Sequence, residues 1–241
     1  MAQMKTPGVY IIEKNAFPNS VVEVATAIPA FIGHTQFARD GNKDLTDIPF
    51  RISSMAEFHS FFGFAPTLRF GIRPEDSESE DTTNDINVLF PDGSCQLTLP
   101  KTFYALYYNM LLFYANGGGP CYIVSVGDYE HDFKSIDFTN ALLALKKEQE
   151  PTLVVVPEAV YMEEGDCYKV QTAALMHCGN DMKNRFAILD VFNGYKDENG
   201  AVIKSFRENI GSNFLAYCAS YYPWINTSIV TEKDITFYNI A

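Results

Sequence analysis

The run that decides the fold is Cys121-Tyr122-Ile123-Val124-Ser125-Val126. Nearly all of its side chains are apolar, and polar and apolar residues do not alternate along it. A short strand with this pattern is typical of a sheet that is covered on both faces, as in parallel sheets flanked by helices. The sequence therefore predicts a buried central strand at residues 121–126.

Similar apolar runs occur on both sides of this strand, and segments with helical patterns separate them. The predicted strands are Phe31–Gly33, Leu153–Val156 and Phe186–Leu189, and the predicted helices are 101–115, 137–147, 168–178 and 204–210. Alternating strands and helices of this kind are typical of α/β domains. We therefore expect an α/β fold with a mixed, largely parallel sheet flanked by helices.

Two segments depart from this alternation. Residues 1–25 are predicted to form an extended N-terminal arm, and residues 26–241 the α/β core with an inserted β-rich lobe at about 63–100. In the lobe, strands at 86–90 and 95–99 flank a Pro-Asp-Gly-Ser turn, which favours a hairpin. A short helix is expected at 54–62, and the acidic segment 74–85 is expected to face solvent.

The composition excludes several classes of partner. The chain of 241 residues has a formal net charge of −12, so we expect neither nucleic-acid binding nor direct membrane binding. Its five cysteines are widely spaced, without a Cys-x-x-Cys pair, which indicates reduced thiols and folding in a cytoplasm. The N-terminal residues do not include the apolar stretch of a signal peptide.

The motifs that could carry chemistry are weak. Gly117-Gly118-Gly119 follows a predicted helix and precedes a strand, the reverse of a phosphate-binding loop, so a helix-ending turn is expected. Cys167, His177 and Cys178 offer too few ligands for structural zinc. We therefore expect no bound metal or cofactor.

Asp190 is the strongest single candidate for catalysis. It follows the predicted strand 186–189, where α/β enzymes place catalytic carboxylates, although a capping or loop-anchoring role is the alternative. No Gly-x-Ser-x-Gly motif accompanies it. The chain is therefore predicted not to be an enzyme, with a small-molecule enzyme on an α/β fold kept as the less favoured alternative.

Five stretches, in this order, resemble stretches typical of contractile tail sheath proteins. They are Thr6–Glu13 (the family's T-P-G-V-Y opening), Ile28–Gly33, the pair Phe113–Gly118 and Cys121–Val126 (F-F-x-N-G-G and C-Y-V-V-x-V), Arg185–Asp190 (R-F-A-I-L-D) and Tyr221–Trp224 (Y-Y-P-W). Each is loose alone, but together they extend over most of the chain. The chain thus resembles the sheath family of contractile phages and related extracellular injection particles.

Three features differ from the family pattern. Ser125 stands where an arginine is frequent, and Phe192-Asn193 replaces the usual proline after the aspartate. Sheath subunits usually continue past Y-Y-P-W into a further C-terminal domain, whereas this sequence ends at Ala241, so we expect that domain to be missing from it. Both a piece of a longer protein and a short member of the family remain open.

The resemblance implies a mechanical function. Sheath subunits stack as six-membered rings around an inner tube and drive the tube through a target envelope on contraction. The implied partners are other copies of the chain, the inner tube protein, and baseplate and cap proteins, assembled in the cytoplasm of the producing cell as part of a phage tail or a released particle. A cap or baseplate-proximal ring component is the alternative structural role.

The N-terminal arm supplies the expected interface. Its apolar run has no hairpin partner of its own, which suits addition as a strand to the sheet of a neighbouring subunit. The residues predicted to make this contact are Pro7, Gly8, Val9, Tyr10, Ile11, Ile12 and Glu13.

Overall fold

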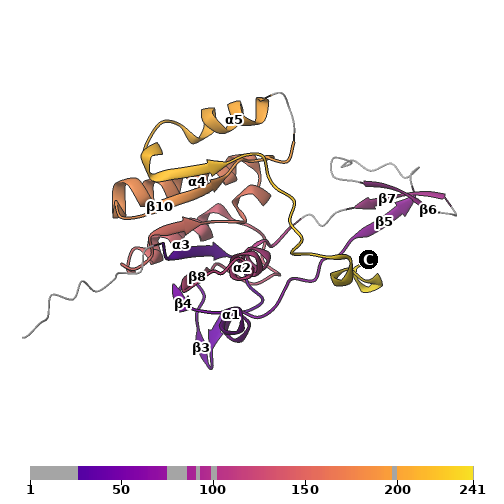
Figure 1. Cartoon of the computed structure of the whole chain (residues 1–241), viewed down its shortest axis with the longest axis horizontal. Coiled ribbons are helices and arrows are strands. Elements are labelled where there is room, and N and C mark those ends of the chain that lie inside the picture. The colour runs from indigo at the N-terminus through magenta and orange to yellow at the C-terminus, as the bar shows by residue number, and fades with distance from the viewer. Residues whose placement is uncertain (1–26, 75–85, 91–92, 99–101, 197–199, 241) are drawn as a thin grey trace, which may run out of the picture.

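The computed structural model describes residues 27–74, 86–90, 93–98, 102–196 and 200–240. Its core is a six-stranded sheet in the order β11-β10-β9-β1-β8-β4, flanked by helices on both faces (Figure 1). All neighbouring strands pair parallel except β4, which pairs antiparallel with β8. The predicted α/β fold with a mixed, largely parallel sheet is confirmed.

The four predicted core strands all lie in this sheet. They are β1 (Pro29–Gly33), β8 (Cys121–Ser125), β9 (Leu153–Val155) and β10 (Phe186–Asp190). The two edge strands are β4 (Phe50–Ile52) and β11 (Cys218–Tyr221). Every residue of β1 and β8 is buried, which is the physical reason for their continuous apolar sequences.

Helices α3 (Ser135–Leu145), α4 (Glu164–Met176) and α5 (Ala201–Ile210) pack on one face of the sheet. Helices α1 (Met55–Phe62) and α2 (Leu106–Ala115) pack on the other. Four predicted starts were wrong: α2 begins at Leu106 instead of 101, α3 at Ser135 instead of 137, α4 at Glu164 instead of 168, and α5 at Ala201 instead of 204. Acidic residues in the first turn of α4 favour its earlier start because they complement the helix dipole.

The side chains of β1 show how the sheet divides the core into two layers. Ala30 and Ile32 lie in the cluster beneath α3, α4 and α5, whereas Phe31 lies in the cluster beneath α1 and α2. Helix α1 has the predicted ends, because the Ser54 side chain accepts a hydrogen bond from the Glu57 N–H and Gly63 ends the helix with a positive φ of 85°.

A second, three-stranded sheet projects from the core within the predicted lobe (Figure 1). Its strands β5 (Gly71–Pro74), β6 (Ile86–Phe90) and β7 (Gly93–Thr98) have the order β5-β7-β6. Strands β6 and β7 pair antiparallel, as the turn signal predicted. A small ribbon of β2 (Arg39–Asp40) and β3 (Lys43–Asp44) lies beside α1. The N-terminal arm and almost all of the acidic segment 74–85 lie outside the described residues.

The remaining elements are short. They are η1 (Ala159–Tyr161), the π-helical turn η2 (His177–Met182), η3 (Leu215–Tyr217), η4 (Glu232–Asp234) and η5 (Phe237–Asn239). Residues 222–240, here termed the C-terminal segment, run from β11 to the base of the three-stranded sheet (Figure 1). There the Phe70 N–H donates to the Asn239 carbonyl at 2.7 Å.

Candidate functional site

The strand order reverses between β1 and β9. From β1 the chain passes α1 and α2 to reach β8, and then α3 crosses the opposite face to bring it back to β9 on the other side of β1. In α/β proteins, the crevice at the carboxyl ends of two such strands is the usual place for a ligand. The residues that follow β1 and β9 therefore form the candidate site.

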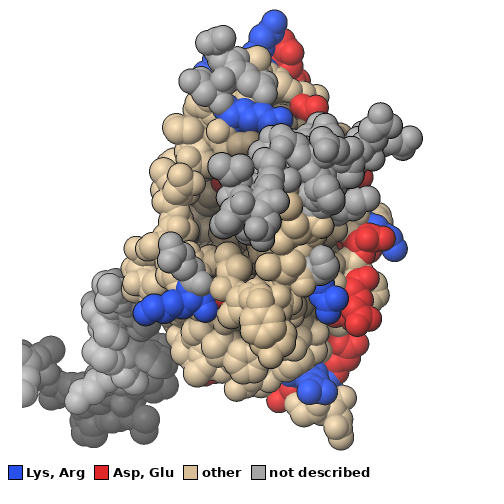
Figure 2. All heavy atoms as spheres, turned by 90° about the vertical axis from the view of Figure 1, so that its right-hand side faces the viewer, with Lys and Arg blue, Asp and Glu red and all other residues tan. Residues whose placement is uncertain are grey.

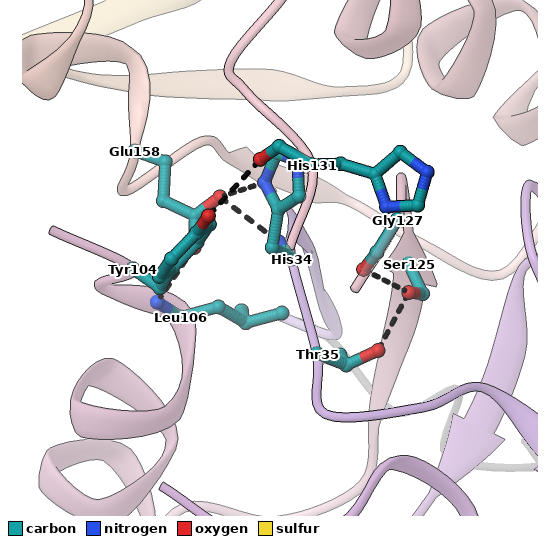
Figure 3. Close-up of polar contacts among 8 residues, drawn as sticks. All are labelled: His34, Thr35, Tyr104, Leu106, Ser125, Gly127, His131 and Glu158. Carbon is teal, nitrogen blue, oxygen red and sulfur yellow. Dashed lines mark hydrogen bonds and ion pairs between the residues drawn. The ribbon is translucent and has the colours of Figure 1, made fainter. Parts of the chain in front are cut away.

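A buried pair of side chains fills this position (Figure 3). Glu158, which follows β9, is 0% exposed, and His34, which follows β1, is 1% exposed. The Glu158 carboxylate accepts hydrogen bonds from the His34 backbone N–H at 2.9 Å, from His34 Nδ1 at 2.8 Å and from the Leu106 N–H at 3.2 Å. Because Leu106 is the first residue of α2, this carboxylate also serves as the N-terminal cap of that helix.

Gly33 allows the N-terminus of α2 to come this close to β1. A Cβ atom at Gly33 would lie 2.9 Å from the Leu106 Cβ and 3.0 Å from the Glu158 Cδ. Any larger residue would therefore separate the helix from the carboxylate. This close approach explains why β1 ends in glycine.

Aromatic rings enclose the His34 imidazole. The ring centroids of Phe133, Tyr104 and Phe138 lie 4.9, 5.3 and 5.7 Å from it. Its Nε2 atom has no hydrogen-bond partner among the residues that the structure describes. The pair is thus packed away from solvent, and it ties the ends of β1 and β9 to α2.

The neighbouring hydroxyl groups bond to one another and to the backbone. Thr35 Oγ1 and Ser125 Oγ lie 2.6 Å apart, and both are within hydrogen-bond distance of backbone carbonyls, those of Phe37 and Gly127 respectively (Figure 3). His131 lies nearby but pairs with Asp128 at 2.6 Å on the surface. Within the described structure, Ser125 Oγ therefore contacts a hydroxyl and a carbonyl and not the base that activates a nucleophilic serine.

Asp190 lies at the carboxyl end of β10, as the sequence predicted, and borders a pocket of about 470 Å³. The pocket lies between α2, η1 and the C-terminal segment, and its walls include Tyr108, Tyr161 and Trp224. Burial raises the pKa of the Asp190 carboxyl. In the part of the chain that the structure describes, no group forms a hydrogen bond or ion pair with this carboxyl, so the alternative of a capping or loop-anchoring role finds no contact there.

The glycine run forms a helix-ending turn, as predicted. The Gly118 N–H donates to the Phe113 carbonyl at 2.9 Å and the Gly117 N–H to the Tyr114 carbonyl at 3.1 Å, with a φ of 82° at Gly117. These bonds use the last free carbonyls of α2. The amides therefore face the helix and do not form a phosphate cradle.

The cysteines and histidines that were weighed as metal ligands serve the core. Cys167 on α4 and Cys178 on η2 are buried in the core, and burial raises the pKa of both thiols. His177 Nε2 lies 2.8 Å from the Arg185 guanidinium. Among the described residues, no group of three His, Cys, Asp or Glu side chains is placed to hold a metal ion.

The predicted interface residues Pro7 to Glu13 lie outside the described residues. The sequence interpretation missed the pair of His34 and Glu158, which lie 124 positions apart. A usable signal was present, because each follows a predicted apolar strand and the carboxyl ends of adjacent parallel strands meet. The interpretation also missed Trp224 as a wall of the pocket beside Asp190.

Comparison with known protein families and with curated protein sequences finds no match to this chain. None of the helices that the structure describes has the length and apolar character needed to cross a membrane.

Proposed function

We propose that this chain is a structural subunit of a contractile sheath that surrounds an inner tube and drives it through a target envelope. The proposal rests on the resemblance of five sequence stretches to sheath proteins and on one structural observation. That observation is a set of large apolar side chains held in solvent along the C-terminal segment.

These apolar side chains are highly exposed. Ile225 is 84% exposed, Tyr238 78% and Phe237 71%, and Ile235 and Ile240 are also exposed. Exposed apolar side chains grouped on one part of a surface are typical of protein–protein contacts. In Figure 2, which views the lobe end of the molecule, neutral side chains occupy the middle of the face and acidic ones gather along one margin.

Hydrogen bonds hold the turn that carries Phe237 and Tyr238, here termed the aromatic pair. Thr236 and Asn239 close the turn around it, since the Thr236 N–H donates to Asn239 Oδ1 at 2.8 Å. Asn239 Nδ2 in turn donates to the Leu68 carbonyl at 2.9 Å. The rings of Phe237 and Tyr238 lie 3.9 Å apart. A turn with satisfied hydrogen bonds thus presents both rings to solvent, as an assembly contact requires.

The carboxyl edge of the sheet is consistent with a structural role. The crevice where many α/β enzymes bind their substrate contains Glu158 and His34, which are sealed by aromatic rings and bonded to the backbone. The alternative of a small-molecule enzyme would need a substrate to enter elsewhere along this edge, at the pocket beside Asp190.

Electron microscopy of the purified protein at high concentration tests the proposal. We expect rings or tubes, and a variant lacking residues 1–13 should stay folded by circular dichroism but build no long tubes. A variant lacking residues 1–5 is the matched control, because it keeps the apolar run Val9–Ile12. Normal tubes from the variant lacking residues 1–13 would refute the strand-addition role of Pro7 to Glu13. Rings of the unmodified protein that never stack would favour the cap or baseplate-proximal alternative. Failure of the unmodified protein to assemble would refute the sheath proposal.

The exposed aromatic pair gives a second test. The double variant Phe237→Ser, Tyr238→Ser should fold normally but raise the protein concentration needed for assembly at least about tenfold, because buried interface aromatics carry much of the binding energy. Leu143→Ser is the control, since Leu143 is 56% exposed and lies on α3, outside the C-terminal segment. Sedimentation of assembled material measures both, and equal assembly of the two variants would contradict the proposal.

A further inference from the structure

The pocket beside Asp190 has a wall of aromatic rings. The centroids of Phe103 and Tyr161 lie 5.0 Å apart, those of Phe103 and Tyr108 5.5 Å, and those of Tyr161 and Trp224 6.2 Å. All of these residues line the pocket. The faces of aromatic rings carry negative charge density and attract cations.

The indole of Trp224 is fixed in this wall. Its Nε1–H donates to the Val191 carbonyl at 3.0 Å, and its backbone N–H donates to the Gly194 carbonyl at 3.0 Å. A Cβ atom at Gly194 would lie 2.5 Å from the indole, so this ring position depends on glycine. The wall is therefore formed before any ligand binds, which lowers the entropic cost of binding.

The charge at the pocket is negative and uncompensated. Asp190 is the single charged residue in the lining that the structure describes, and no Lys, Arg or His side chain accompanies it there. Burial raises the pKa of Tyr161 to about 12, and the negative charges of Asp190 and Glu158 contribute to this increase. Because Asp190 is the charged residue of this lining, a cation is the ligand charge that the pocket favours.

We propose that this pocket binds an organic cation, an ammonium or guanidinium group on a short alkyl stem, with the charged group at Asp190 and the stem against the aromatic wall. The apolar side chains of Leu112, Val160 and Ile229 complete the surface for the stem. Free alkylamines and the lysine or arginine side chain of a partner protein share this chemistry. The inference does not depend on the sheath assignment.

Trp224 allows a direct test, because it is the only tryptophan in the chain and it lines the pocket. Titration with n-butylammonium chloride should change its fluorescence saturably, whereas 1-butanol, with the same stem and no charge, and sodium chloride should not. An equal response to 1-butanol would overturn the proposal, and so would the absence of a saturable response to the cation.

Two variants locate the interaction. Asp190→Asn removes the charge at almost constant size and should weaken n-butylammonium binding about tenfold or more, and Tyr161→Leu should weaken it several-fold. Glu208→Gln is the control, because this exposed carboxylate lies on α5, outside the pocket lining. Near-ultraviolet circular dichroism checks that each variant keeps its tertiary packing. Unchanged affinity in a folded Asp190→Asn variant would overturn the proposal.

The source of the cation is decided by two further probes. Binding of Nα-acetyl-lysine N-methylamide would support the proposal and identify a protein side chain as the ligand. Binding of 1,5-diaminopentane without binding of the lysine derivative would support it and identify a free amine. If neither probe bound, the proposed cation site would be refuted.

Discussion

Two carboxylates stand at the same edge of the sheet, and their surroundings are opposite. Glu158 follows β9, is fully buried and accepts three hydrogen bonds. Asp190 ends β10, borders an open pocket and has no hydrogen-bond donor within the described structure. The neighbouring elements explain the difference. The N-terminus of α2 packs on Glu158, whereas the C-terminal segment lies beside Asp190 and forms one wall of a pocket there.

The comparison distinguishes a carboxylate that stabilises the fold, Glu158, from one that remains available to a ligand, Asp190. A buried carboxylate with complete hydrogen bonding holds several elements together, and losing it leaves buried donors unsatisfied. A half-buried carboxylate at the rim of a pocket, without a partner among the described residues, costs some stability and is better suited to binding a ligand than to holding the fold. Mutations at the two positions should therefore change the free energy of unfolding in opposite directions.

The largest effect is expected for Glu158→Ala. Three buried donors would lose their acceptor, and α2 would lose its N-terminal cap, so the free energy of unfolding should fall by about 3–5 kcal/mol. Urea denaturation measures this value. Glu208→Ala, at a mostly exposed carboxylate on α5, is the control and should change the free energy by less than about 0.5 kcal/mol. Similar losses for both variants would contradict the assigned role of Glu158.

A smaller loss is expected for His34→Phe, which keeps an aromatic ring among Phe133, Tyr104 and Phe138 but removes the Nδ1 donor. The free energy of unfolding should fall by about 1–3 kcal/mol. In a double-mutant cycle with Glu158→Gln, the combined loss should be smaller than the sum of the single losses. Additive losses would mean that the two side chains do not depend on each other.

A buried ionisable side chain also lies at the opposite, amino edge of the sheet, where His177 contacts Arg185. Burial and the Arg185 charge lower the pKa of His177 from 6.5 to about 4. The unfolded chain therefore binds a proton that the folded protein rejects, and stability present above pH 6.5 should be lost as the pH falls toward 4. The loss attributable to this residue is on the order of 1–2 kcal/mol. Urea denaturation measures the free energy of unfolding across this pH range, and this free energy should fall less steeply with decreasing pH in His177→Gln. An unchanged pH dependence would contradict a lowered pKa of His177.

The smallest effect, with the opposite sign, is expected for Asp190→Asn. The raised pKa means that the folded protein holds a proton longer than the unfolded chain, so this group reduces stability as the pH rises above its ordinary value of 3.8. At pH 7 the variant should be more stable by no more than about 1 kcal/mol, and this gain should disappear in acid. A loss of stability on this substitution would show that Asp190 has a structural partner.

The order of apolar runs was sufficient to predict much of the fold. The runs at 31–33, 121–126, 153–156 and 186–189 became adjacent strands, because strands buried on both faces need uniformly apolar sequences. The Ser54 cap, the glycine turn after α2 and the position of Asp190 were also predictable, since each depends on residues close in sequence.

Helix starts were less predictable where distant residues decide them. The backbone N–H of Leu106, the first residue of α2, donates to the carboxylate of Glu158, 52 positions away, and no local motif marks that start. The starts of α4 and α5 were also placed several residues too late. Helix ends marked by glycine, such as Gly63 after α1, were predicted correctly because a positive φ is a local requirement.

The sequence by itself determined the four central strands, the two-faced burial of the sheet and the strong negative charge, because hydrophobic pattern and composition are properties of the residue order. Only the tertiary structure decided which of the two carboxylates is fully buried and hydrogen-bonded and which one borders a pocket. Glu158 and Asp190 both follow apolar strands and look equivalent in sequence. They differ because elements distant in the chain pack beside them. The N-terminus of α2 covers Glu158, whereas the ring of Trp224 forms the wall of a pocket beside Asp190.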